Sequence, residues 1–463
     1  MTVVLLNGHF LVDRSAGGGR ETSAVSPSRQ PSVAVLSFTD LSPGGDQAYF
    51  AQGIAEELQS QLSRLEGLVV AGRSSSFSFR GTKDDLQTIG RKLGVSNILQ
   101  GSVRREGDRV RISAQLIDTT SGYQRWSQTY ERESGDIFAI QDEIAKAVAG
   151  ALSIALGVDA RNLLQGVGTH NFEAYDNFLA GSVHLRDGRN LGQSIVLFNR
   201  AIELDPNYAA AWAALALTYG QASWGAVRQD ALDLLGKGYQ AARHAVELDP
   251  KLAEAHSILA QLTMAHNDWL GAEAEHATAL ELSDNASTLL AYATLAGRSG
   301  RIDRALTYVN LSVRLDPFRP LISSWRSWFL IAQGRRADAL AEIDRGSDLG
   351  IDRESIEEYR LYAQASGGTA ADVKRQLQRL AAMSSPDAPF FRAVRSKFES
   401  RPDVLLELRR WYGDEASQGP DSRLHIAVLA GYFGDPKFAL GVMSAELHES
   451  TLRIATIWFP VFR

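Results

Sequence analysis

The stretch Ala201-Ile-Glu-Leu-Asp-Pro206-Asn-Tyr-Ala-Ala-Ala-Trp212-Ala-Ala-Leu215-Ala216 recurs as Ala245-Val-Glu-Leu-Asp-Pro250-Lys-Leu-Ala-Glu-Ala-His256-Ser-Ile-Leu259-Ala260. Each copy holds the apolar end of one helix, an Asp-Pro stop and the start of the next helix. A chain that repeats this unit stacks copies of one helical hairpin. We therefore predict a solenoid of antiparallel helix pairs, which offers a surface to partners and carries no chemistry of its own.

The unit resembles the tetratricopeptide (TPR) repeat of about 34 residues. Its first-helix signature is matched by Trp212-x2-Leu215-Ala216-x2-Tyr219 with one conservative change. The closing positions are spaced by 44, 34, 33 and 34 residues when they are taken as Pro206, Pro250, Asp284, Pro317 and Ile351. The sequence therefore predicts five units, the second lengthened by ten residues around Gly220 to Gly238.

Helix axes approach within about 8 to 10 Å only where the side chains between them are small. In the register above, the three contact positions of every unit hold Ala, Gly or Ser, which favours a TPR array over a generic helical bundle. These positions are Ser182, Ala216, Ala260, Ala293 and Ser327 in the first helices, then Ser194, Gly238, Ala272, Ala305, Ala339, Ala201, Ala245, Ala279, Ser312 and Gly346 in the second. At each Leu-Asp-Pro boundary we expect the Asp to N-cap the next helix and the Pro to occupy its first turn.

The amino-terminal part has an α/β pattern. Apolar runs at 33–38 and 68–71 predict buried strands, and amphipathic patterns at 46–65, 84–93 and 136–156 predict helices. Three segments at 96–104, 109–118 and 123–131 predict an antiparallel meander. In its middle strand apolar residues alternate with polar ones, which indicates one buried face and one solvated face.

This part resembles the amino-terminal domain of TolB as it recurs in bacterial multidomain regulators. The resemblance rests on Ala34-Val-Leu-Ser-Phe38, Tyr49-Phe-Ala-Gln-Gly-Ile-Ala-Glu-Glu-Leu58, Arg73-Ser-Ser-Ser-Phe77, Leu99-Gln-Gly-Ser-Val-Arg104, Gln115-Leu-Ile-Asp118, Trp126 and Ile137-Phe-Ala-Ile-Gln141. It implies a non-catalytic module placed between an output domain and a TPR array. Members of this group carry a winged-helix DNA-binding domain or a nucleotide cyclase domain upstream, and neither fits in 30 residues.

We predict the following order of parts along the chain. A flexible, Gly- and Ser-rich segment at 1–30, with a strand or hairpin at 3–12, precedes the TolB-like α/β domain at 31–156. A linker at 157–170 leads into five TPR repeats at 171–351. Residues 352–463 are expected to form degenerate TPR-like helices and a carboxy-terminal tail, because the small contact residues fade after Ile351 and return only at Ala427 and Ala439.

Composition narrows the function classes. The 463 residues include 48 Lys and Arg against 54 Asp and Glu, so a net charge of -6 predicts no nucleic-acid binding by this chain alone. The chain has no cysteine, which excludes disulfides, thiolate zinc sites and cysteine nucleophiles. Neither a signal peptide nor a membrane span is recognisable, so we expect a cytoplasmic location, or a periplasmic one if an upstream anchor is missing. Nothing in the sequence predicts an oligomeric state.

No motif predicts catalysis, a cofactor or a metal site. The histidines at 244, 256, 266 and 276 never form an i, i+4 pair, and His256 and His276 fall at helix-packing positions, which favours buried structural histidines. Arg73-Ser-Ser-Ser76 follows a strand and could hold an anion, but it lacks the glycines of a phosphate loop and no helix is expected directly after it.

Two surfaces are candidates for binding a protein or peptide partner. Arg104, Arg109 and Arg111 on the meander could contact an anion or an acidic partner, but the acidic residues Glu106 and Asp108 in the adjoining turn favour a solvated strand face that blunts the sheet edge. First helices line the groove of a TPR array, and their side chains there are the candidate partner-binding residues, with ordinary solvated surface as the alternative. These residues are Asp176, Arg186, Gln221, Glu254, Gln261, Arg298 and Trp325.

Two functions fit these observations. The first is a non-catalytic interaction and sensory scaffold that binds a partner segment in the TPR groove. The second is the regulatory remainder of a signalling protein whose output is DNA-binding transcriptional control or cyclic-nucleotide synthesis, with the output domain encoded upstream or missing. A hydrolase or transferase has no motif behind it.

Overall fold

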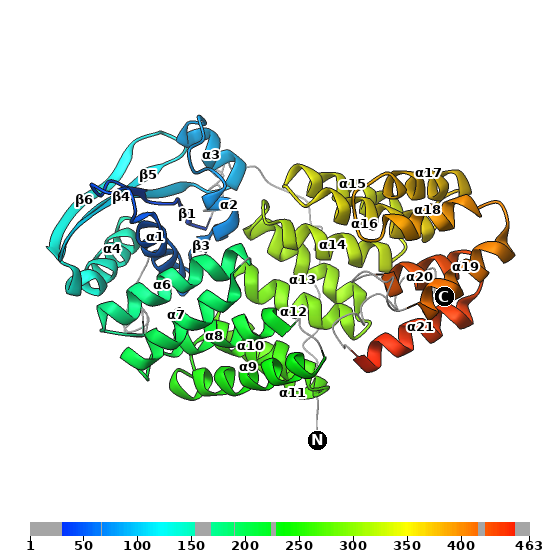
Figure 1. Cartoon of the computed structure of the whole chain (residues 1–463). Coiled ribbons are helices and arrows are strands. Elements are labelled where there is room, and N and C mark those ends of the chain that lie inside the picture. Colours follow the sequence, from blue (N-terminus) through cyan, green and yellow to red (C-terminus); the bar gives the residue numbers. More distant parts are fainter. Residues whose placement is uncertain are drawn as a thin grey trace, which may run out of the picture. The chain divides into compact units, whose positions relative to one another are not determined.

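The computed structural model describes residues 30–65, 67–152, 168–188, 190–223, 228–414 and 422–449. The predicted hairpin at 3–12, most of the predicted linker at 157–170 and the end of the carboxy-terminal tail lie outside these residues. In the described part, an α/β unit is followed by consecutive helices (Figure 1), so the predicted fold class of an α/β domain followed by an all-α TPR solenoid is confirmed.

The α/β unit is built on a mixed sheet with the strand order β3-β1-β4-β5-β6. Strand β1 pairs in parallel with β3 and β4, β2 pairs with β4, and β4, β5 and β6 form the predicted antiparallel meander. The strands are β1 (Ser32–Val35), β2 (Thr39–Asp40), β3 (Val69–Val70), β4 (Asn97–Glu106), β5 (Arg109–Asp118) and β6 (Gln124–Glu133). The helices are α1 (Ala48–Ser63), α2 (Arg73–Phe77), α3 (Leu86–Leu93) and α4 (Ile137–Ala151), the last preceded by a 3-10 turn, η1 (Ser134–Asp136).

Side chains of β1 point alternately to the two faces of the sheet, and each face carries its own apolar core. Val33 and Val35 pack with α1 and α4 on one face of the sheet, whereas Ala34 packs with Ile89 and Leu93 of α3 on the other. Because α3 covers only the β1 end, the outer face of the meander stays polar and open to solvent (Figure 1). The predicted alternation along β5 is confirmed, with Val110 buried and Arg109 exposed.

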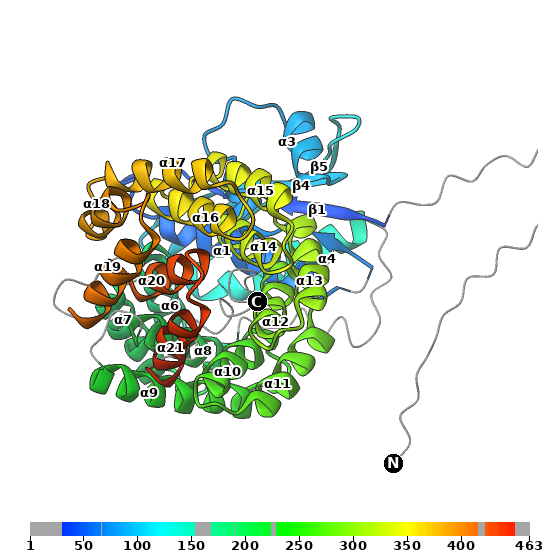
Figure 2. The same ribbon diagram turned by 90° about the vertical axis from the view of Figure 1, so that its right-hand side faces the viewer.

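Antiparallel helix pairs follow in the predicted register (Figure 2). All fifteen predicted contact positions are buried except Ser182, which is half-buried. The second helix of the lengthened unit has 21 residues, whereas α7, α11 and α13 have 14 each, so much of the extra sequence extends that helix. The pairs are α6 (Phe172–Asp187) with α7 (Leu191–Leu204), α8 (Ala209–Ala222) with α9 (Arg228–Leu248), α10 (Ala253–Ala265) with α11 (Trp269–Leu282), α12 (Ala286–Arg298) with α13 (Ile302–Leu315), and α14 (Pro320–Ala332) with α15 (Arg336–Asp348).

The less regular helices beyond the fifth pair continue the same hydrophobic core. Phe390, Leu408 and Ile426 are buried in one cluster with the fourth and fifth pairs. The helices are α16 (Arg353–Ala365), α17 (Ala370–Ala381), α18 (Ala388–Ser396), α19 (Arg401–Gly413), α20 (Ser422–Tyr432) and α21 (Pro436–Glu449).

The structure corrects two local predictions. Asp205 is the C-cap of α7 and not the N-cap of α8, because α8 begins only at Ala209, beyond the proline. Its carboxylate instead accepts the amide proton of Asn207 and so stabilises the turn between the helices. The second correction concerns Arg73-Ser-Ser-Ser76, where a short helix, α2, begins at once after Gly72.

The core of the α/β unit continues into the first helix pair. Tyr175 and Leu179 of α6 are buried in the same cluster as α1 and α4, and the Tyr175 hydroxyl accepts a hydrogen bond from the Gln141 amide at 2.9 Å. Close packing at this contact requires a glycine, since a Cβ on Gly53 of α1 would lie 2.4 Å from Leu179. The α/β unit and the first repeat therefore share one apolar core.

Among the described residues, no helix is both long and apolar enough to span a membrane.

Candidate functional site

The first predicted groove residue, Asp176, faces the α/β domain. Its carboxylate accepts a hydrogen bond from the Tyr49 hydroxyl at 2.8 Å and pairs with Arg105 at 3.3 Å. The Arg105 guanidinium lies against two aromatic rings, 5.4 Å from the centre of Phe50 and 4.8 Å from that of Phe172. Burial and the nearby Asp176 carboxylate raise the pKa of Tyr49 to about 12, so the phenol stays a hydrogen-bond donor at neutral pH.

A polar pocket of about 430 Å³ opens beside this pair of charges. Its lining includes Ser42, Asp46, Gln47, Arg105 and Asp176. Arg105 and Asp176 already pair with each other, and the Asp46 carboxylate accepts a hydrogen bond from the Gln47 side chain, so the pocket offers polar groups and an acidic side chain to a ligand.

Arg186, at the other end of α6, also contacts α1. Its guanidinium pairs with Glu56 at 2.9 Å, and Arg73 pairs with the same carboxylate oxygen at 3.3 Å. Two of the predicted groove side chains thus hold a helix of the α/β domain against the array.

The Glu254 side chain of α10 lies in the electrostatic field of α1. Loss of hydration by the surrounding protein raises its pKa, Arg73 and Arg64 oppose this, and Glu56 adds to it. On the α1 side, burial raises the pKa of Glu57 to about 6, with further contributions from the charges of Glu254 and Asp142. Glu254 itself is exposed to solvent, and charges of both signs on the α/β side act on it, with Arg73 and Arg64 of opposite sign and Glu56 of the same sign.

Gln221 and Gln261 are the predicted groove residues with the most freedom to meet a partner. Both side chains are exposed. The Gln261 amide donates to the carbonyl of Ser257 one turn earlier on its own helix, at 3.2 Å. Partner binding by these residues stays a prediction.

Arg298 and Trp325 form a pair within the array. The Arg298 guanidinium lies 5.2 Å from the centre of the Trp325 ring, and burial lowers the pKa of this arginine to about 10. Arg298 is only 6% exposed, and it borders a pocket of about 340 Å³ that Trp269 and Leu270 also line. Of the two, only Arg298 lines this pocket, and partner binding by the pair stays a prediction.

The three arginines of the meander lie on its open polar face. Arg104 and Arg111 are directly opposite each other on β4 and β5. Arg104 pairs with Glu106 at 3.1 Å, and Arg109 pairs with Glu131 at 3.6 Å, so acidic neighbours partly compensate the patch. Anion binding here also stays a prediction.

The segment at 73–76 binds an anionic group of the same chain, the carboxylate of Asp316. Asp316, in the turn between α13 and α14, accepts hydrogen bonds from the amide of Ser75 at 2.7 Å and from its hydroxyl at 2.5 Å. Among the described residues, the α/β domain thus contacts the array at the first repeat and also at the junction of the fourth and fifth. The sequence singles out the segment of Ser75 and the Leu-Asp-Pro turn of Asp316 separately, but no pattern in it indicates that the two segments contact each other.

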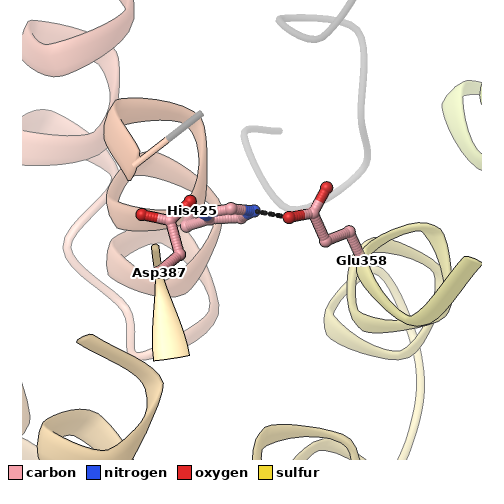
Figure 3. A group of neighbouring side chains, drawn as sticks. All are labelled: Glu358, Asp387 and His425. Atoms are coloured by element: carbon pink, nitrogen blue, oxygen red, sulfur yellow. Dashed lines mark ion pairs between the residues drawn. The ribbon is translucent and has the colours of Figure 1, made fainter. Parts of the chain in front are cut away.

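A group of Glu358, Asp387 and His425, which sequence reasoning missed, lies among the helices beyond the fifth pair (Figure 3). Glu358 lies 3.2 Å from Nε2 of the imidazole, and Asp387 lies 3.6 Å from Nδ1. A single metal ion can use only one ring nitrogen, so carboxylates at opposite nitrogens suit an imidazolium bridging two acids better than a metal centre. No local motif could have revealed the group, because the three residues come from three separate helical segments.

Two histidines considered from the sequence are buried between helices, as predicted. His256 bonds through Nδ1 to Glu275 at 2.6 Å and through Nε2 to the carbonyl of Pro250 at 3.0 Å. His276 is fully enclosed, and burial lowers its pKa to about 4, with a smaller contribution from Arg298.

Comparison with known proteins finds one partial relative by sequence and no matching family. No family model matches it. It is 37% identical over 254 residues to a protein named putative adenylate cyclase 3 from Rhizobium meliloti (strain 1021). The match covers 54% of this chain and 42% of the relative, so the chain spans less than half of that protein.

Solved structures give more distant likenesses. PilW, a type IV pilus biogenesis factor, is matched over 47% of this chain and 97% of its own, with a TM-score of 0.39 and 16% identity. YrrB, a TPR protein with a peptide-binding site, is matched over 39% and 89%, with a TM-score of 0.30 and 16% identity. TolB from Acinetobacter baumannii is matched over 27% and 29%, with a TM-score of 0.21 and 13% identity. Likenesses of this size do not indicate a shared function.

Proposed function

We propose that this chain is a non-catalytic scaffold in which a TolB-like α/β domain and a TPR array together bind a protein partner. The supporting observation is that first-helix side chains of the array already bind a helix. Asp176 contacts Tyr49 of α1 and Arg105 of β4, and Arg186 contacts Glu56 of α1. A surface that binds one helix in this way has the polar anchors and the shape to bind a partner segment at its exposed positions.

A second function, the regulatory part of a nucleotide cyclase, is favoured by one comparison. The relative of 37% identity is named a putative adenylate cyclase, and the chain spans 42% of it. We propose that the matched region regulates the relative and that nucleotide chemistry belongs to the region this chain does not match. The scaffold then acts on an output domain in the same protein or in a partner.

A partner-capture experiment tests the scaffold. A photo-crosslinking amino acid at Gln221 should capture a partner from the source cell, and Gln261→Lys should weaken that capture about tenfold, equivalent to ~1.4 kcal/mol. The matched control is Gln193→Lys on α7, an exposed glutamine on a second helix. Equal capture by both variants would contradict binding in the groove.

A separate measurement addresses catalysis. The purified chain is incubated with ATP or GTP and Mg²⁺ or Mn²⁺, and cyclic nucleotide is quantified. We expect none above the buffer blank. Turnover that scales with protein concentration would overturn the non-catalytic assignment.

A further inference from the structure

We infer that the contact between Ser75 and Asp316 is a releasable latch, which closes the α/β domain over the array while α6 stays permanently attached. The inference deepens the proposed scaffold function and rests on it, because the latch would control how far α1 covers the groove. Three features of the structure support it.

The first feature is a change in how one turn is built. In the turns after α7 and α9, the amide two residues after the aspartate donates to that aspartate's own carboxylate, at 3.1 Å for Asp205 and 3.0 Å for Asp249. In the turn after α13, the corresponding amide of Phe318 donates at 2.8 Å to the hydroxyl of Ser75 instead. The Ser75 hydroxyl thus replaces the local carboxylate as the acceptor in this turn. The Asp316 carboxylate instead accepts hydrogen bonds from the α/β domain.

The second feature is the close approach of the two backbones. The amide of Gly72 donates to the carbonyl of Leu315 at 2.5 Å. A Cβ on Gly72 would lie 2.2 Å from the Cβ of Asp316, so only glycine allows this approach. Phe79 and Phe318 pack edge to face beside it, with ring centres 5.7 Å apart.

The third feature is the contrast between the two contacts. At α6, Tyr175 and Leu179 are buried in the core of the α/β domain, and separating them would expose apolar surface. At the latch, Asp316 is 2% exposed, and its carboxylate would regain hydration on opening. Phe318 also packs against an apolar cluster of the α/β domain at the latch, but it is only partly buried, whereas Tyr175 and Leu179 are buried. The latch therefore exposes less apolar surface on opening and opens at lower cost, with α6 as the pivot.

Spin labels can test the latch cleanly because the chain has no cysteine. One pair, Lys83→Cys with Ala341→Cys, spans the latch, and a second pair, Lys146→Cys with Val196→Cys, spans the α6 contact; all four positions are exposed. Distance distributions are measured by double electron–electron resonance on the full chain.

Three variants disturb the latch in different ways. Asp316→Ala removes the acceptor, and Ser75→Ala removes one donor. Gly72→Ala keeps every polar group and adds a wedge at a residue whose φ of -61° suits alanine. The matched control is Asp249→Ala, since its carboxylate accepts the amide of Lys251 in an equivalent turn.

We expect each latch variant to lengthen and broaden the distances of the first pair, with the open-to-closed ratio rising at least about tenfold. The second pair and the Asp249→Ala control should keep their distributions. Unchanged distances across the latch in all three variants would overturn the inference. So would broadening of both pairs in Gly72→Ala, because the two contacts would then act as one rigid unit.

The same samples separate the latch from the proposed function. If the first pair opens as expected but wild type and variants capture no partner through Gln221, the scaffold function fails and the latch stands. If partner capture succeeds while the distances never change, the latch fails and the scaffold stands.

Discussion

The hydroxyl of Ser75 donates to the carboxylate of Asp316 across 241 residues of sequence and accepts the amide proton of Phe318 in the same turn. One side chain therefore completes a turn of the array from another domain. The energy of this contact depends on both partners, because removing one leaves a buried polar group without its hydrogen bond.

Gly53→Ala should destabilise the protein by about 1 to 3 kcal/mol, because the added methyl would overlap Leu179. The sign is informative, since alanine in place of a helical glycine is otherwise stabilising by up to about 1 kcal/mol. Urea unfolding measures the change. Gly150→Ala on α4, which meets nothing within 4 Å, is the control and should be neutral or stabilising.

Glu57→Gln should stabilise the protein at neutral pH. The folded-state pKa of about 6 exceeds the ordinary glutamate value, so wild-type stability falls as pH rises toward 6 and stays reduced above it. The variant should be about 1 to 2 kcal/mol more stable at pH 7.5, with the difference vanishing near pH 4. Its neighbour gives the opposite control, because Glu56→Gln loses two ion pairs and should be less stable by roughly 1 kcal/mol.

His276→Gln should make the protein less sensitive to acid. Burial holds the pKa of His276 at about 4, below the unfolded value near 6.5, so protons bind the unfolded chain first and stability falls between pH 6.5 and 4. The variant should lose up to about 3 kcal/mol less than wild type over this range. Thermal unfolding at a series of pH values measures it, and His244→Gln, with a side chain 44% exposed, should follow wild type.

Glu358→Gln should cost roughly 3 to 5 kcal/mol, because it leaves His425, which is fully buried, with reduced charge compensation. Chemical unfolding measures the loss, and the control is Glu354→Gln, at a half-buried glutamate in the first turn of the same helix. If the group is an ionic bridge, excess EDTA should leave the melting temperature unchanged. A fall on chelation that Zn²⁺ restores would identify a metal centre instead.

The fold was largely predictable because its signals are local or periodic. The small residues at contact positions such as Ala216 and Ala305 fix the helix register, and alternation along β5 fixes the faces of the sheet. Every repeat needs small residues where its helices touch, and every second residue of a half-buried strand must be apolar. Patterns that recur in this way can be recognised in a single sequence.

The contacts between parts were not predictable, because each depends on two segments that carry no common pattern. Ser75 lay in a segment that could hold an anion, and Asp316 was expected, like the aspartate of each Leu-Asp-Pro boundary, to N-cap the next helix. His425 was an isolated histidine until the fold placed Glu358 and Asp387 at its two nitrogens. Asp176 and Arg186 were assigned to the groove by helix position, but their contacts with α1 required the structure.

Tyr175 and Leu179 of the first repeat are buried against the α/β domain, so this domain covers the amino-terminal end of the array. An array of helical repeats needs a polar covering on its terminal unit to remain soluble. Here a whole domain supplies that covering at the amino end, in place of a specialised helix. A fragment beginning at residue 171 would therefore expose an apolar surface and tend to aggregate. The smallest soluble fragment of the array must retain the α/β domain as well.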